Sequence, residues 1–232
     1  MQHFKTLLIA VLSISLLGIA QFIAATAVSM ARFPDGYSFS ENFLSDLGRA
    51  SVASSSLFNG SLVVLGLSLL PLFGMVTVLD PRRSVSAQAT TVLGVVSALG
   101  IVGLGLTPID RQFISHHVAL AAWLFPMLYM TVSFFYVVSR SPHVGVWFLS
   151  ASLVMVVGMT IVLLNTKITT VELLQKSVVV CGFVWLLYII AFICQSGLAM
   201  IKNWNNEDDE REQREQEYFS TLIQQRNHKP GD

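Results

Sequence analysis

The stretch Leu57–Leu79 reads LFNGSLVVLGLSLLPLFGMVTVL and contains no Asp, Glu, Lys or Arg. A bilayer span needs about 20 mostly apolar residues, so this stretch is long enough to cross one. Its polar and apolar residues do not alternate, as they would along a strand of a membrane barrel. Inside the hydrocarbon each backbone amide has to bond within its own segment, and the stretch therefore predicts a transmembrane helix.

Five further stretches have the same character, and each ends at a charge, a proline or a polar cluster. Together the six predict an all-α protein with a bundle of six transmembrane helices, which would form a domain over residues 1–202. The expected spans are Lys5–Ala31, Leu57–Leu79, Gln88–Thr107, His116–Ser139, Gly145–Leu164 and Lys176–Ile201.

The composition supports this class of protein. Apolar residues make up 53% of the 232-residue chain, whereas charged residues make up only 12% and sum to a formal net charge of zero. A soluble domain averages about 25% charged residues. The composition excludes a soluble globule, a nucleic-acid-binding protein and a disordered chain.

The ends of the chain leave two questions open. Lys5, the apolar run after it and the small residues Ala25–Ala27 also resemble a cleavable signal peptide, whose removal would leave five spans. Lys and Arg are divided almost evenly between the two sets of loops. We expect a multi-pass protein of the cell membrane with both termini in the cytoplasm.

Residues 203–232 form a charged tail. Glu207 with Arg211, and Glu210 with Arg214, are acid-before-base pairs at helical spacing, so we expect a cytoplasmic helix that extends the last span. The alternative is that residues 203–228 bind a protein partner or the membrane surface through a small apolar face, formed by Tyr218, Phe219, Leu222 and Ile223.

The first external loop contains YSFSENFLSDLG, residues Tyr37–Gly48. Ser38 followed by Glu41 is a capping-box pattern, and Gly48 is typical of a helix end, so the loop predicts a short interfacial helix around residues 39–47. Either this helix is a lid or an interface plug whose polar face meets water, or its polar residues point into a polar pocket between the spans. In the second case Asn42, Ser45 and Asp46 would line the pocket.

The connection before the fourth span reads PIDRQFISHH, residues Pro108–His117. Asp110 lies near the positive end of the coming helix, and His116 and His117 begin the span, so at least one imidazole should point into the bundle. Ionisable groups at membrane depth are functional candidates. Glu172 and Lys176, before the sixth span, are expected to form an exposed pair at i,i+4 spacing.

Topology brings these segments together, because the first, third and fifth connections emerge on the same side. We therefore predict a polar ligand-binding site at the external membrane face, with Asp46, Asp110 and His117 also candidates for catalysis. No resident metal is expected, because adjacent histidines diverge by about 100° and HxxxH is absent, although zinc is an alternative. The candidate binding residues are Asn42, Ser45, Asp46, Asp110, His116 and His117.

Two further patterns concern helix packing. Small residues in the third span, among them Gly94, Ala98, Gly100 and Gly105, predict a close approach of another helix backbone. Polar residues within the spans are expected to make interhelical hydrogen bonds, and these are Gln21, Asn59 and Gln195.

The stretches YSFSENFLSDLG and PIDRQFISHHVALA resemble the multi-pass family known as domain of unknown function 998, over roughly residues 5–200. The resemblance implies a six-span bundle in a prokaryotic-type cytoplasmic membrane, with no settled activity. More distantly, the chain is similar to transmembrane hydrolases of the alkaline ceramidase type, in which Ser, Asp and His surround a metal. Ser45, Asp46, Asp110 and His117 would match, but the paired histidines of the last spans are missing.

These observations predict a protein that binds membrane lipids or a small ligand, or an accessory membrane subunit. The alternative is a membrane-embedded lipid hydrolase, with Asp46 and Asp110 as metal ligands or acid/base groups and His117 as a ligand or general base. A transporter is less well supported, because no charged residue lies at the middle of a span.

Overall fold

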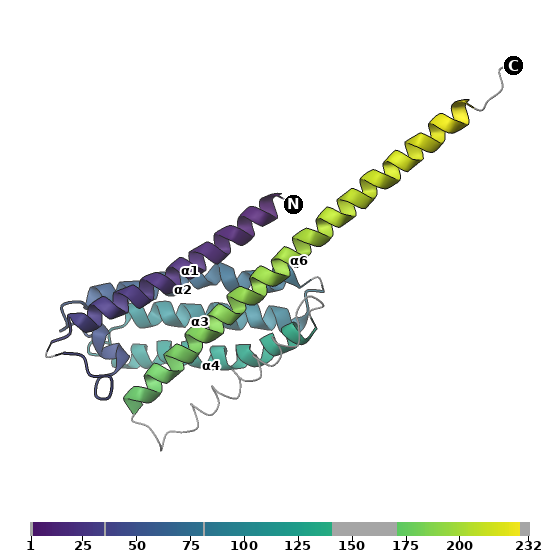
Figure 1. The fold of residues 1–232 in the computed structure, drawn as a ribbon. Coiled ribbons are helices and arrows are strands. Elements are labelled where there is room, and N and C mark those ends of the chain that lie inside the picture. Colours follow the sequence, from purple (N-terminus) through teal and green to yellow (C-terminus); the bar gives the residue numbers. More distant parts are fainter. Residues whose placement is uncertain (1, 35, 81, 141–170, 228–232) are drawn as a thin grey trace.

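The computed structural model describes residues 2–34, 36–80, 82–140 and 171–227, and this part of the chain is all-helical, as predicted (Figure 1). The predicted fifth span, Gly145–Leu164, lies outside the described residues. The described elements are α1 (Gln2–Ala31), the short 3-10 helix η1 (Leu44–Gly48), α2 (Ser55–Leu79), α3 (Val85–Leu106), α4 (Phe113–Ser139) and α6 (Val171–Asn227).

Five helices of the described chain are long and apolar enough to cross a bilayer: α1, α2, α3, α4 and α6. Their outer faces carry large apolar side chains that the rest of the chain leaves uncovered, such as Leu17 at 68% exposure and Phe125 at 63%. A soluble protein rarely exposes so much continuous apolar surface, whereas lipid tails solvate it well. The fold therefore indicates an integral membrane protein.

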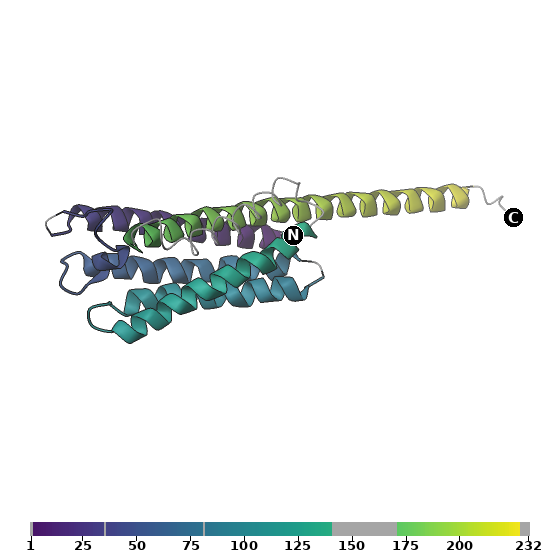
Figure 2. The same cartoon turned by 90° about the horizontal axis from the view of Figure 1, so that it is seen from below.

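The helices pack in a simple order. Helix α2 packs against α1 and α3, and α3 packs against α4, while α6 lies across α1 and α2. Figure 2 shows α1 and α6 side by side, with α3 and α4 on the far side of α2. Residues 32–54, residues 107–112 and the start of α6 lie at the same end of the bundle (Figure 1), which we call the first-loop end.

Glycines set the closest helix contacts, as the sequence predicted for the third span. A Cβ atom added at Gly100 would lie 2.4 Å from the backbone nitrogen of Trp123 in α4. One added at Gly105 would lie 2.5 Å from the backbone oxygen of Asn59 in α2. Real Cβ atoms do not approach backbone atoms this closely, so only glycine allows these helices to meet.

Polar side chains within the spans find partners across the bundle. The Gln21 side chain in α1 donates a hydrogen bond to the backbone oxygen of Ser61 in α2, at 2.8 Å. The Asn59 side chain donates to the backbone oxygen of Gly48, at 2.9 Å, and so joins α2 to η1. These bonds satisfy amides that lipid could not, and they agree with the prediction for Gln21 and Asn59.

Helix α6 continues well beyond the other helices (Figure 1). Its 57 residues correspond to about 86 Å at 1.5 Å per residue. Trp204 still packs edge-on against Phe4, with ring centroids 5.2 Å apart, but residues 205–221 are all exposed. The helical extension that the sequence predicted is present over residues 203–227.

At the opposite end of the bundle, Asp80 shapes the tight turn between α2 and α3. Its carboxylate accepts hydrogen bonds from the backbone N–H of Arg82 and from both the N–H and the hydroxyl of Ser84. Ser84 in turn caps α3 by accepting from the backbone N–H of Ala87, at 3.2 Å. Burial raises the pKa of Asp80, but the hydrogen bonds and the Arg82 charge outweigh burial and hold that pKa below its ordinary value of 3.8.

The lowered pKa gives a testable pH dependence. A carboxyl whose pKa is lower in the folded state stabilises the fold above its unfolded pKa, and the contribution is lost as the pH falls through the folded pKa. We expect Asp80→Asn to lower the stability by about 1 kcal/mol at pH 7, since the turn is partly exposed. Melting curves in detergent should show this difference shrinking below pH 3.8. A difference that is the same at all pH values would contradict this origin.

Candidate functional site

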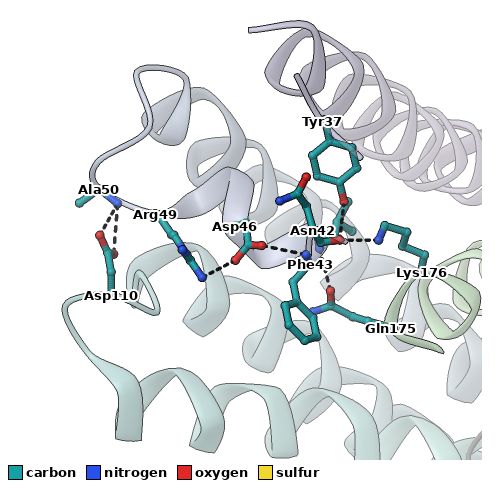
Figure 3. A network of polar contacts seen from close by, with 10 residues as sticks. Tyr37, Asn42, Phe43, Asp46, Arg49, Ala50, Asp110, Gln175 and Lys176 are labelled. Carbon is teal, nitrogen blue, oxygen red and sulfur yellow. Dashed lines mark hydrogen bonds and ion pairs between the residues drawn. The ribbon is translucent and has the colours of Figure 1, made fainter. Parts of the chain in front are cut away.

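Lys176, in the first turns of α6, anchors the first loop (Figure 3). Its ammonium donates hydrogen bonds to the backbone oxygens of Phe39, at 2.7 Å, and Asn42, at 2.5 Å. It also lies over the aromatic rings of Tyr37 and Phe39, 5.5 and 5.9 Å from the ring centroids. These contacts join two segments more than 130 residues apart in the chain.

The prediction that Glu172 and Lys176 form an exposed pair is therefore wrong, because Lys176 binds backbone oxygens of the first loop instead. The ammonium meets the backbone oxygen of Glu172 at 3.3 Å, and no ion pair to the Glu172 carboxylate forms within this described segment. The loop oxygens compete successfully for the ammonium because they lie close together and have no amide partner of their own. Sequence analysis missed this role, since i,i+4 spacing on one helix carries no information on distant loops.

The helix in the first loop is shorter than predicted. Residues 39–41 form a turn, and helical geometry begins only at Leu44. The reason is visible in Figure 3: the Asp46 carboxylate accepts from the backbone N–H of Phe43, and the Gln175 side chain accepts from that of Leu44. Both bonds satisfy amides at the start of η1, so the interfacial helix expected over 39–47 is replaced by η1 at Leu44–Gly48.

The predicted acidic residues serve these loop contacts. Asp46 is 5% exposed and pairs through its second oxygen with Arg49, at 2.8 Å. Both oxygens of Asp110 accept from the backbone N–H of Ala50, at 3.1 and 2.9 Å, and so hold the first loop to the connection between α3 and α4. Asn42 accepts from the backbone N–H of Ser38, at 2.8 Å. All three side chains are thus occupied with the fold of the loop.

Tyr37 belongs to the same network. Its hydroxyl donates to the backbone oxygen of Asn42, at 3.4 Å. Burial, and then the nearby charge of Asp46, raise the pKa of Tyr37 to about 12. The phenol therefore stays protonated, and remains a donor, throughout the physiological pH range.

A cavity lies directly beneath the first loop. Its volume, counted as the space that the centre of a water-sized molecule can occupy, is about 90 Å³, and it lies between α2, α3, α4 and α6. Leu44, Ser45 and Gly48 of η1 form the wall at the first-loop end. Most of the remaining wall is apolar, and of the described residues that line it none is Asp, Glu, Lys or Arg.

His116 is an ionisable residue of this wall. It is 7% exposed, and its Nδ1 lies 2.7 Å from the backbone oxygen of Thr107. A carbonyl oxygen only accepts, so Nδ1 must carry the hydrogen, and in the neutral ring Nε2 is left as an acceptor. Together with Ser45, Asn59 and Gln175, His116 places polar groups at the first-loop end of a largely apolar cavity.

His117 points elsewhere. It is exposed, its Nδ1 lies 2.8 Å from the backbone oxygen of Phe113 on its own helix, and its ring packs against the Phe113 ring at 4.2 Å. The prediction that at least one of the two imidazoles would enter the bundle holds for His116. Of the six candidate binding residues, only Ser45 and His116 line the cavity.

At the deep end of the cavity lies Trp185, which sequence analysis did not identify. Its side chain is fully buried, and its indole N–H has no hydrogen-bond partner within the described chain. The indole stacks on Tyr188 and meets Phe134 edge-on, with centroids 5.3 Å apart in both pairs. A tryptophan within an apolar span does not stand out in the sequence. That its N–H lacks an acceptor, and that it lines a cavity, can be seen only in the three-dimensional structure.

Among the described residues, no group of three His, Cys, Asp or Glu side chains is arranged to hold a metal ion. Comparisons of the chain with family models, curated proteins and solved structures give no match. The resemblances drawn from the loop motifs therefore stay predictions.

Proposed function

We propose that this membrane protein binds one lipid or another apolar small molecule in the cavity beneath the first loop. The observation that carries the proposal is the cavity itself, a largely apolar chamber with a few polar groups gathered at its first-loop end. Ligand sites in proteins have this character, since the apolar wall supplies affinity and the few polar groups fix orientation. The first-loop end would face the outside of the cell membrane, with both termini in the cytoplasm.

The cavity is long in the direction of the helix axes, and this supports a ligand that lies lengthwise in it. Trp185 lies ten positions after Gln175 in α6, which is about 15 Å along the helix axis. Met130 lies fourteen positions after His116 in α4, or about 21 Å. All four residues line the cavity, so it leads from the loops into the middle of the bundle.

Filling the chamber tests the proposal. Gly182 lines the cavity, and a Cβ atom there would meet only Met127, at an ordinary contact distance of 3.7 Å. We expect an apolar molecule to co-purify with the wild type, and we expect Gly182→Leu to fold and to lose it, as measured by mass spectrometry of organic extracts. Gly60→Leu is the matched control, since Gly60 is exposed with nothing within 4 Å of its Cβ position. Equal amounts of ligand in the two variants would contradict the proposal.

A lipid hydrolase is the second candidate, because Ser45 and the buried His116 line the same cavity. Asp46 and Asp110 would then position the loop, since their oxygens bind backbone amides. Turnover of a lipid ester or amide by the purified protein, lost in His116→Ala, would favour this function.

The extension of α6 is the proposed contact to a protein partner. Residues 205–217 carry seven acidic and two basic side chains, and all of them are exposed. Tyr218 and Phe219 follow at 63% and 60% exposure. An acidic helix with an aromatic pair at its far end is suited to an accessory subunit that binds a basic surface.

A further inference from the structure

If the cavity is the binding site, as proposed above, the residues around it restrict the chemical class of the ligand. Trp185 offers one N–H group that is fully buried and lacks an acceptor in the described chain. Such a donor has given up its bonds to water without gaining another partner, which is a cost to the folded protein. A ligand that brings an acceptor to this point removes that cost and gains orientation.

The position of the donor excludes ordinary acyl lipids in their usual orientation. Trp185 lies about 15 Å along α6 from Gln175, which lines the first-loop end of the cavity, and it is near the middle of the spans. A phospholipid whose headgroup stays at the membrane surface has only methylene groups at that depth. The acceptor must therefore belong to the end of the ligand that enters the cavity first.

The residues that line the cavity indicate whether the end of the ligand that enters first is charged or neutral. Among the described residues that line the cavity none is acidic or basic, so a carboxylate or an ammonium at the deep end would find no countercharge there in a medium of low dielectric constant. A neutral carbonyl oxygen has no such penalty.

We propose that the ligand is a neutral, apolar molecule with a carbonyl group at its leading end, and that this oxygen accepts a hydrogen bond from Trp185 Nε1–H. The apolar remainder of the ligand fills the chamber towards the first-loop end. The carbonyl can belong to a ring, as in a prenylated quinone, or to an open chain, as in a long-chain ketone. Trp185 thereby becomes the residue that determines specificity.

The test uses the full-length protein in lipid nanodiscs and three probes: 2-decyl-1,4-benzoquinone, dodecan-2-one and decylbenzene. We expect one of the two carbonyl probes to bind about tenfold more tightly than decylbenzene in isothermal titrations, as one hydrogen bond predicts. Trp185→Phe keeps the aromatic ring and removes the donor, so it should abolish the difference. Trp204→Phe is the control, since Trp204 packs against Phe4 away from the cavity.

A second measurement does not depend on any variant. Infrared difference spectra of the bound carbonyl probe should show its C=O band at lower frequency than in the empty nanodisc. Decylbenzene binding as tightly as both carbonyl probes, or an unshifted band in the wild type, would overturn this inference and leave the cavity proposal intact. Failure of every probe to compete with the co-purified molecule, together with unchanged ligand in Gly182→Leu, would overturn both. Tighter binding of the quinone would indicate a ring carbonyl in the natural ligand, and tighter binding of the ketone would indicate an open-chain carbonyl.

Discussion

Gly100→Leu should lower the free energy of unfolding by about 3 kcal/mol or more, the upper part of the range for overpacked interiors. Already the Cβ atom would lie 2.4 Å from the backbone nitrogen of Trp123 and 2.7 Å from the carbonyl carbon of Ala122. Backbone atoms of α4 cannot move aside as a flexible side chain could. The leucine can be accommodated only if α3 and α4 separate, which also exposes the wall of the cavity.

Thermal melting of the purified variant in detergent, followed by circular dichroism or size-exclusion chromatography, measures this effect. Gly60→Leu makes the same chemical change on an exposed face of α2, and it should melt close to the wild type. Equal melting temperatures for Gly100→Leu and the wild type would show that the α3–α4 contact is less tight than the structure has it.

Lys176→Met should release the first loop without unfolding the bundle. The substitution keeps an unbranched apolar side chain but removes the hydrogen bonds to the backbone oxygens of Phe39 and Asn42. Hydrogen bonds from a charged group contribute about 1.5–3 kcal/mol, which corresponds to a roughly 10- to 100-fold change in the opening equilibrium of the loop. Amide hydrogen exchange of residues 41–46 should accelerate by that factor.

The matched control is Lys202→Met, which removes an exposed lysine from the same helix far from the loop. Exchange within α2 and α3 should stay unchanged in both variants, because the contacts of Lys176 reach only the loop and the start of α6. Unaltered exchange of residues 41–46 in Lys176→Met would mean that Asp46, Asp110 and Gln175 suffice to hold the loop.

The spans could be predicted from sequence because length and hydrophobicity are local properties. Leu57–Leu79 was expected from composition, and α2 ends at that same Leu79. The start of the first-loop helix could not be predicted this way. Ser38 and Glu41 form a valid local capping pattern, but Gln175 and Asp46 satisfy the amides at Leu44 and Phe43 instead. A bond that spans 131 positions leaves no trace in a window of a few residues.

The candidate site, too, could be predicted from the sequence only in part. The segments were correctly brought to one end of the bundle by counting spans, and His116 and Ser45 do line the cavity. Which of two adjacent histidines faces inward depends on the rotation of α4, and that is set by its packing against α3. Trp185 carries no charge and lies in an ordinary apolar run, so only the three-dimensional arrangement reveals its unpaired N–H.

Because α6 is one continuous helix, a small rotation near its start displaces its far end by a larger distance. Lys176 holds one end of this helix to the first loop, and Asn227 lies 51 positions further on, about 76 Å along the axis. If the helix pivots at Lys176 by about 5°, its far end is displaced by roughly 7 Å on this geometry. The same pivot would shift Trp204, 28 positions from Lys176, by roughly 4 Å against Phe4 of α1. A rearrangement of the loop above the cavity would thus be transmitted through the contact between α1 and α6 to a protein bound to the acidic extension.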